Sequence, residues 1–300
     1  MHELTVKLPV RRAHLAARPA RRPERDFCLE IARQAVRSLY AELTLYPKPG
    51  LVSLVDNGSH TDMTAETFMR SLFSLRHYFV QITRAGMDDA PFSTLKRLGI
   101  EAEARMLRAT RGINTHRGAV FCLGLLCASI GSCRARGIAL TPGAIRATLL
   151  LRWADALAAH SHPATADSHG LRVAQRYAAS GAREEAALGL PSVFEVALPA
   201  LRCTLAARRG TRRARVDALF ALMGHISDTN LYHRGGAEGA MTVRRHARAF
   251  IDAGGTASED WEARALACHH AFVAARLSPG GAADLLAAAC LLHAVCAGSH

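Results

Sequence analysis

The sequence predicts an all-α fold, built as a single-domain bundle of roughly ten helices. Half of the 300 residues are apolar and only 6% are aromatic, with alanine and leucine dominant. This composition favours packed helices over sheets. Apolar residues recur every three or four positions along most of the chain, whereas strand-like alternation is confined to short, ambiguous pieces. No linker-like segment divides the chain, so one core is expected.

This periodicity predicts the helices in chain order. The first helix carries apolar residues from Leu29 to Leu43 and ends before Pro47, because proline cannot continue a helix. The second extends from Phe68 to Ile82, and Thr64 can cap its start. Further helical runs cover residues 93–109, 117–134, 143–158, 170–180, 192–207, 213–226, 238–252, 259–276 and 281–296.

The first residues of the chain and its cysteines bear on the cellular location of the protein. Residues 1–25 hold many arginines without a long apolar core, so we predict a disordered basic tail and no secretory signal. The longest apolar stretch, at 118–131, has 14 residues, which is too short to span a bilayer. The eight cysteines form no C-x-x-C pair. We therefore expect reduced thiols, a cytoplasmic location and no membrane partner.

The chain carries a net charge of +13, from 38 basic and 25 acidic residues. Nucleic acid, a membrane surface or an anionic small substrate could each use such a charge. A coding bias toward arginine is the alternative explanation. No basic run is interleaved with aromatic residues, so a base-stacking surface is not expected, and nor is a nucleic-acid partner.

The loop "YPKPGLVSLVDNGSHTDM", residues 46–63, is the first candidate site. Pro47 and Pro49 restrict the backbone on either side of Lys48, which makes a preorganised charge for a phosphate. Gly50 would let the backbone approach a ligand. Metal ligands could come from three side chains that follow, Asp56, His60 and Asp62. The alternative is an ordinary proline-rich loop with capping acids.

Two helix starts share a pattern of Asn, His, Arg and Gly. They are "NTHRG" at 114–118 and "NLYHRGG" at 230–236, the second preceded by Asp228. Helix N-termini present free N–H groups and a positive dipole end, which suit phosphate. Each could also be a capped helix with a surface arginine. The candidate phosphate-binding residues are Asn114, His116, Arg117, Asn230, His233, Arg234, Gly235 and Gly236.

Other polar stretches carry weaker signals. "SHG" at 168–170 lies in a histidine-rich loop, and "SPGGAADLL" at 278–286 opens the last helix, where Asp284 sits as a capping acid would. His269, His270 and His293 lie in apolar helices and are expected to be structural. The sequence has no H-E-x-x-H pair, no G-x-x-x-x-G-K-[ST] loop and no G-x-G-x-x-G loop. The common nucleotide-binding loops are therefore excluded.

Taken together, these stretches resemble the triphosphoribosyl-dephospho-coenzyme A synthases. The resemblance covers residues 28–296 and depends on motifs in the order "YPKPGLV", "GSHTDM", "GINTHRGAVF", "SHG", "EEAALGLPSV", "DTNLYHRGG" and "SPGGAADLL". Two positions depart from the family pattern: Ser53 stands where an acid is frequent, and Glu184 where a glycine is usual. Neither removes a residue whose loss would abolish the chemistry.

The resemblance implies an all-α catalytic domain at 26–300 that takes ATP and 3′-dephospho-coenzyme A. It implies transfer of the 5-triphosphoribosyl group of ATP to a ribose hydroxyl of the acceptor, with release of adenine. The product would pass to a transferase acting on an acyl carrier protein. We expect the malonate decarboxylase branch rather than the citrate lyase branch, because no fused transferase domain is apparent. The oligomeric state is left open.

Breaking the ribose–adenine bond requires an oxocarbenium-like transition state, as in glycoside hydrolysis. Lys48, Arg117, Arg234 and a Mg²⁺ ion could hold the triphosphate. Carboxylates could bind metal or accept the proton of the attacking hydroxyl. The expected catalytic residues are Glu42, Asp62, Asp228 and His116; the expected metal ligands are Asp56, Asp62 and Asp228. Contacts to phosphate or purine are expected from His60, His116 and His233.

Two other functions are compatible with the residues. A helical metal-dependent phosphohydrolase also pairs histidines and aspartates along helices, but such enzymes usually carry an adjacent His-Asp dipeptide, which this chain lacks. A non-enzymatic helical module that binds RNA or an acidic protein would use the +13 charge. Release of adenine, release of inorganic phosphate, and steeply salt-dependent RNA binding distinguish the three.

Overall fold

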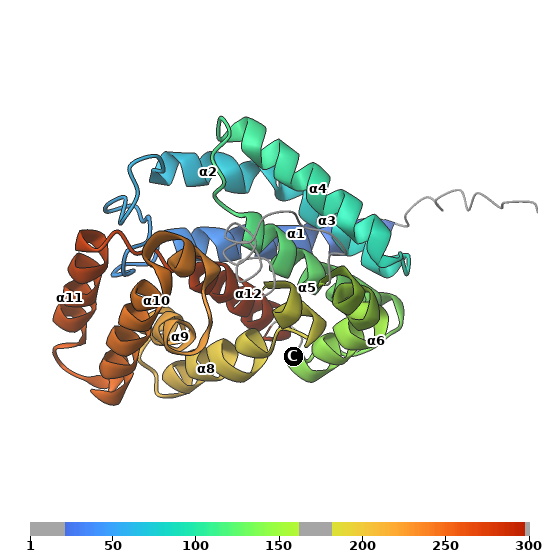
Figure 1. Ribbon diagram of the computed structural model, residues 1–300. Coiled ribbons are helices and arrows are strands. Elements are labelled where there is room, and N and C mark those ends of the chain that lie inside the picture. The colour runs from blue at the N-terminus through green and yellow to red at the C-terminus, as the bar shows by residue number, and fades with distance from the viewer. Residues whose placement is uncertain (1–21, 162–181, 298–300) are drawn as a thin grey trace, which may run out of the picture.

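The computed structural model describes residues 22–161 and 182–297, and the predicted all-α fold is confirmed for these ranges (Figure 1). All regular elements within them are helical. In chain order they are α1 (Arg22–Leu43), α2 (Ala65–Ser74), α3 (Arg76–Met87), α4 (Phe92–Ala109), α5 (Arg117–Ala135), α6 (Pro142–Ser161), the π-helix η1 (Ser192–Ala197), α8 (Leu198–Ala206), α9 (Thr211–His225), α10 (Thr229–Asp252), the 3₁₀-helix η2 (Gly255–Ala257), α11 (Trp261–Ala274) and α12 (Gly280–Ala297).

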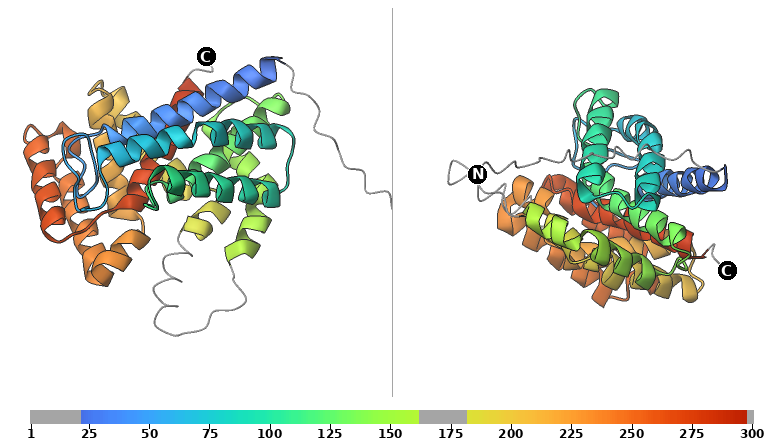
Figure 2. Two further views of the ribbon diagram at one scale, coloured as in Figure 1. Left: turned by 90° about the horizontal axis from the view of Figure 1, so that it is seen from above. Right: turned by 90° about the vertical axis from the view of Figure 1, so that its right-hand side faces the viewer.

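Helix α12 lies at the centre of the bundle. It packs against α1 and α5 from the N-terminal half of the chain and against α8, α9 and α10 from the C-terminal half, and Figure 2 shows it passing between these groups. Buried side chains surround it, Ala282, Leu286, Ala289 and Leu292 among them. A helix that is apolar on all sides belongs in a core, so α12 anchors whatever its N-terminus carries.

Two helices, α5 and α12, are long and apolar enough to cross a membrane by length and composition. Over their most apolar stretches, 78% of α5 residues and 61% of α12 residues are buried inside the bundle. Core helices of a globular protein show this combination. The expectation that this stretch is too short to span a bilayer counted only the uninterrupted apolar run at 118–131. The α5 helix is longer than that run and extends from Arg117 to Ala135.

The prediction of one continuous second helix is wrong. This segment forms two helices, α2 and α3, which meet at Leu75. The Leu75 N–H bonds to Leu72 O at 3.3 Å, and the Ser74 hydroxyl donates to Ser71 O at 2.7 Å. A serine that bonds to a nearby backbone oxygen competes with the helical ladder. The predicted cap is present, since Thr64 and Thr67 form a reciprocal capping box at the start of α2.

Three other boundaries differ from the prediction. Helix α1 begins at Arg22, inside the segment predicted as a tail, while residues 1–21 and the predicted helix at 170–180 lie outside the described residues. Helix α10 begins at Thr229 rather than 238 and is broken at Gly236, where φ is 60° and ψ is −160°. The run predicted at 192–207 starts as the π-helix η1.

Candidate active site

The loop between α1 and α2 folds onto the start of α12. The Ser59 hydroxyl donates to Leu277 O at 2.6 Å, and His60 Nε2 lies 2.8 Å from Ser278 Oγ. Gly50, at φ +69°, approaches Leu277 so closely that a β-carbon would lie 2.2 Å from its carbonyl oxygen. Gly50 was predicted to approach a ligand. The structure corrects this, because the Leu277 backbone fills the space.

Lys48, in the middle of the same loop, is buried with 1% of its surface exposed. Its Nζ donates to Glu42 Oε1 at 2.6 Å and to the Glu42 backbone oxygen at 3.0 Å. An ammonium group has three donors, so Glu42 takes two of them. Lys48 was predicted to help hold the triphosphate; in the structure it instead neutralises a carboxylate at the end of α1.

Asp228 joins the N-termini of α10 and α12. It is 3% exposed, and its two carboxylate oxygens accept from Asn230 N at 2.9 Å and from Ala282 N at 3.2 Å. Burial raises the pKa of Asp228, and the backbone N–H bonds from both helix starts act against that rise. Gly281 lets α12 come this close, since a β-carbon there would lie 3.1 Å from the carboxylate carbon.

Asp284, in the second turn of α12, reaches the start of α5. A β-carbon on Gly118 would lie 2.1 Å from Asp284 Oδ2, and the carboxylate is also hydrogen-bonded by the backbone of Ala119. Burial, followed by the charges of Glu42 and Asp228, raises the pKa of Asp284 well above its usual range. The Asp284 residue is of intermediate exposure, whereas Glu42 and Asp228 are buried.

His116 precedes α5 and is 2% exposed. Its Nδ1 lies 2.6 Å from Ser71 Oγ, which accepts from Thr115 Oγ1 at 2.7 Å. The Ser71 hydroxyl thus links the Thr115 hydroxyl to the His116 ring. Burial and then the Lys48 charge lower the pKa of His116 to about 3. His116 is therefore a neutral ring whose buried Nε2 has no hydrogen-bond partner among the described residues.

We call five of these residues, Glu42, Lys48, His116, Asp228 and Asp284, the central cluster. The charges of Glu42 and Asp228 reach Asp284, and the charge of Lys48 reaches His116. The cluster places three carboxyls and one ammonium where α5, α10 and α12 begin. Because isolated charges are costly in a protein interior, a protonated carboxyl is favoured here. Acid–base chemistry needs such an arrangement.

A second group, His60, Asp62 and Arg234, forms what we call the rim. Arg234 is exposed, lies 3.0 Å from His60 Nδ1 through Nη2, and donates to Ser59 O at 3.2 Å through Nη1. Asp62 lies 3.7 Å from the same histidine and is 59% exposed in its side chain. Burial, then Arg234, lowers the pKa of His60, and Asp62 acts against this. Through His60 the rim also contacts Ser278, just before the start of α12.

Arg117 does not join either group by its side chain. Its guanidinium pairs with Glu103 of α4 and is 59% exposed, while its backbone N–H is capped by Asn114 Oδ1 at 3.2 Å. The "NTHRG" segment therefore brings a helix start and His116 to the site and leaves its arginine on the surface. The predicted phosphate contacts of Asn114 and Arg117 have no support from this geometry.

The three predicted metal ligands are not brought together. Asp56 Oδ2 lies 3.3 Å from His269 Nε2, Asp62 is on the rim, and both Asp228 oxygens bond to N–H groups. Within 22–161 and 182–297, no three His, Cys, Asp or Glu side chains lie together as a metal site. His269 was expected to be structural, and it supports the Lys48 loop through a 3.3 Å contact to Lys48 O.

The rest of "NLYHRGG" has mixed surroundings. Asn230 and His233 are exposed, with the Asn230 amide beside Gly280 at the start of α12. A β-carbon on Gly235 would lie 2.7 Å from Leu277 Cδ2, which indicates a packing role. Gly236 has no atom near that position and breaks α10. The "SHG" stretch lies outside the described residues.

Glu185 and Asp284 are the candidates that sequence reasoning did not select. Glu185 Oε1 accepts from Ser192 N at 2.6 Å, at the start of the π-helix η1, and burial raises its pKa. Single π turns inside helices are frequent at functional sites. Both residues fall within motifs shared with the resembled family, "EEAALGLPSV" and "SPGGAADLL", which is the signal that could have found them. Glu184, the departure from the family pattern, is exposed.

Comparison with known proteins decides the family. Residues 28–300 match the family model described as ATP:dephospho-CoA triphosphoribosyl transferase. The chain belongs to this family. It is 38% identical to a probable 2-(5''-triphosphoribosyl)-3'-dephosphocoenzyme-A synthase of Acinetobacter calcoaceticus, with 86% of this chain and 90% of that protein covered. It is 42% identical to a protein of the same name from Stutzerimonas stutzeri, with 87% and 90% covered. No solved structure matches.

Membership of the triphosphoribosyl transferase family makes the protein a transferase, as the resemblance implied. It also disfavours the phosphohydrolase and the RNA-binding module. Segments from five of the family motifs meet at the start of α12: the Lys48 loop, the His60 turn, the α5 start, the α10 start and the "SPGG" turn. Residues far apart in sequence are thereby assembled around one helix N-terminus.

Proposed function

We propose that the protein transfers the 5-triphosphoribosyl group of ATP to a ribose hydroxyl of 3′-dephospho-coenzyme A. The bond between ribose C1′ and adenine breaks, a bond from C1′ to the acceptor oxygen forms, and adenine leaves with a proton. The observation that carries this proposal is the convergence of the family motifs on the central cluster, where a raised-pKa carboxyl lies beside other acids.

The reaction needs one proton donor and one proton acceptor, and we assign both within the central cluster. Adenine needs a donor, and Asp284 retains its proton to higher pH than an ordinary carboxyl and is less buried than Glu42 and Asp228. The attacking hydroxyl needs an acceptor, for which we assign Glu42, held in place by Lys48. Asp228 positions α10 and α12 rather than moving a proton, since both of its oxygens bond to N–H groups.

The triphosphate is assigned to the rim. Arg234 presents an exposed guanidinium next to His60, and the starts of α10 and α12 add N–H groups and positive dipole ends. A Mg²⁺ ion fits this assignment, because it is usually held by one or two carboxylates plus substrate phosphates. Asp62 is an exposed carboxylate of that kind. When bound, the ion would neutralise part of the triphosphate charge.

One incubation tests the reaction. The full chain is mixed with ATP, Mg²⁺ and dephospho-coenzyme A, and the products are separated by chromatography and identified by mass spectrometry. Free adenine together with an adduct of the acceptor and the triphosphoribosyl group is the expected result. Inorganic phosphate without adenine would favour the phosphohydrolase and defeat the proposal.

A variant of the rim tests the triphosphate assignment. Arg234→Gln should lower kcat/KM for ATP by about 10- to 100-fold, because a charged hydrogen bond to phosphate is lost. Arg208→Gln is a matched control, since Arg208 is exposed in the turn after α8 and belongs to neither group. Equal kinetics for Arg234→Gln and Arg208→Gln would remove Arg234 from the site.

The destination of the product and the location of the protein are further parts of the proposal. We propose that the product serves the acyl carrier subunit of malonate decarboxylase, after handling by a separate transferase, and that the protein is cytoplasmic. Both rest on the sequence, and the relatives' names specify neither carrier. Loading assays with the carrier subunits of malonate decarboxylase and of citrate lyase would separate the two destinations.

A further inference from the structure

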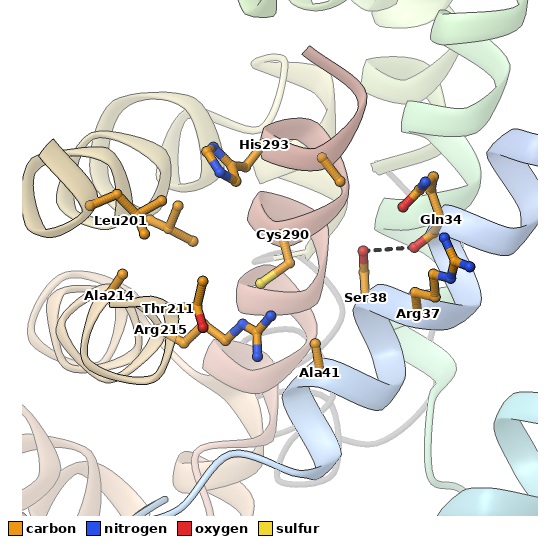
Figure 3. Close-up of a pocket in the computed structure, with 12 residues that line it drawn as sticks. Gln34, Arg37, Ser38, Ala41, Leu201, Thr211, Ala214, Arg215, Cys290 and His293 are labelled. Atoms are coloured by element: carbon orange, nitrogen blue, oxygen red, sulfur yellow. Dashed lines mark hydrogen bonds between the residues drawn. The ribbon is translucent and has the colours of Figure 1, made fainter. Parts of the chain in front are cut away.

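A pocket of about 160 Å³ lies between α1, α8, α9 and α12, away from the rim. Figure 3 shows the Arg215 side chain extending from α9 toward Cys290 of α12 and Ala41 of α1. Arg37 lines the pocket from α1, and His293 lines it from α12. Arg215 is half-buried and Arg37 is exposed, while burial and the charges of Arg202 and Arg215 lower the pKa of His293 and keep its ring neutral.

These basic groups have no acidic partners among the described residues. Neither Arg37 nor Arg215 forms an ion pair there, and the Nδ1 of His293 is buried without a hydrogen-bond partner. Arg215 is half-buried, and its only described polar contact is the Cys290 thiol. Glu42, adjacent to Ala41, is already neutralised by Lys48. An uncompensated cation in a partly buried site is costly, so the half-buried Arg215 favours an anion as the occupant of the pocket.

We propose that this pocket binds a phosphate or pyrophosphate group through Arg37, Arg215 and His293. Arginine forks match phosphate oxygens, and the unpartnered histidine nitrogen adds a further polar contact. The volume is well below the about 300–1,000 Å³ of pockets that enclose a whole drug-sized ligand, so it suits a phosphate group rather than an entire nucleotide. The proposal does not depend on the triphosphate being held at the rim.

The group has three chemical sources, which the test separates: the pyrophosphate bridge of dephospho-coenzyme A, the phosphates of ATP, or a free inorganic ion. Position favours the first. Ala41 lines the pocket and directly precedes Glu42 of the central cluster in α1. The charges of both Arg215 and Glu42 act on the pKa of the Cys290 thiol, so the pocket lies near the cluster. An acceptor anchored there by its phosphates would have its ribose end toward the reacting carboxyls.

The experiment is calorimetric titration of the full chain with inorganic pyrophosphate. The double variant Arg37→Gln/Arg215→Gln should lose one binding site or weaken it by about tenfold or more. Arg33→Gln removes the same charge one turn earlier on α1, where Arg33 pairs with Glu30 outside the pocket, and should bind as the wild type does. Circular dichroism confirms that each variant is folded. Unchanged pyrophosphate binding in a folded double variant overturns the proposal.

Steady-state kinetics then identify the source. A raised KM for dephospho-coenzyme A with an unchanged KM for ATP assigns the pocket to the acceptor, and the reverse assigns it to ATP. If pyrophosphate binding falls while both KM values hold, the pocket takes a free ion. The rim is tested independently, because Arg234→Gln should leave pyrophosphate binding in this pocket intact whatever it does to turnover.

Discussion

Asp284 shows how three helices set the chemistry of one residue. In an isolated helix an aspartate near the N-terminus is an ordinary dipole partner. Here Oδ2 lies against Gly118 of α5, and the charges of Glu42 from α1 and Asp228 from α10 raise its pKa further. The same crowding that makes Asp284 a suitable proton donor makes its ionised form unfavourable in the folded protein.

We predict that Asp284→Asn lowers activity and raises stability. A carboxyl whose folded pKa lies above its ordinary value of 3.8 loses stability as pH rises from that value through the folded pKa. The amide has no such loss, so the variant should be more stable than the wild type at neutral pH by about 1–3 kcal/mol. The difference should shrink as pH falls toward 4. Urea unfolding at several pH values measures this; a constant difference across pH would contradict it.

The Lys48–Glu42 pair gives a second prediction. Lys48→Met should destabilise the fold by about 3–5 kcal/mol, because it leaves Glu42 as an uncompensated buried charge. Removing both charges in Glu42→Gln/Lys48→Met should restore most of that stability without restoring activity. Arg264→Met breaks an exposed pair with Asp260 and serves as the control with a small effect. Chemical denaturation measures all three, and equal losses for Lys48→Met and Arg264→Met would refute the prediction.

At the scale of elements, apolar periodicity predicted α5 and α12 to within about one residue, because both are bounded by clear polar starts. It could not predict the break at Leu75, where a serine hydroxyl competes with the helical ladder, or the π turn of η1. Both depend on contacts that leave the local apolar pattern unchanged.

For the candidate site too, the sequence predicted which residues take part but not the contacts they make. The sequence selected Glu42, Lys48, His116 and Asp228 as candidate site residues, and the structure brings them together. It could not show that Lys48 faces Glu42, since that requires the path of the loop. Nor could it show that Arg117 pairs outward with Glu103, or that Asp284 meets α5 more than 160 residues earlier in the chain.

The meeting of α5 and α12 leads to a prediction for Gly118. In Gly118→Ala the new methyl group would displace the Asp284 carboxyl, so kcat/KM should fall by about tenfold or more and stability by about 1–3 kcal/mol. Gly143→Ala is the matched control, because no atom lies within 4 Å of its β-carbon position at the start of α6. That change should be neutral or slightly stabilising.

The outcome for Gly118 can be separated from general damage. If displacement of Asp284 is the cause, Gly118→Ala should cost little further activity when introduced into Asp284→Asn. Full activity in Gly118→Ala would show that the carboxyl can move without consequence, and would remove it from the proposed chemistry.

At the scale of the whole molecule, α12 links the two halves of the chain. It touches α1 and α5 on one side and α8, α9 and α10 on the other, and its start holds the candidate site. The site is therefore only as rigid as the packing along α12. A loss of packing deep in α12 should therefore lower the local stability of both halves at once.

Leu286→Ala tests this dependence. Leu286 is fully buried on α12, so the cavity should cost about 2–5 kcal/mol. Because α12 packs against both halves, amide hydrogen exchange should accelerate in α1 and α9 as well as in α12. Leu151→Ala, at a side chain 85% exposed on α6, removes the same atoms and should change stability by less than about 0.5 kcal/mol. Faster exchange confined to α12 would mean that the halves are held together by other contacts.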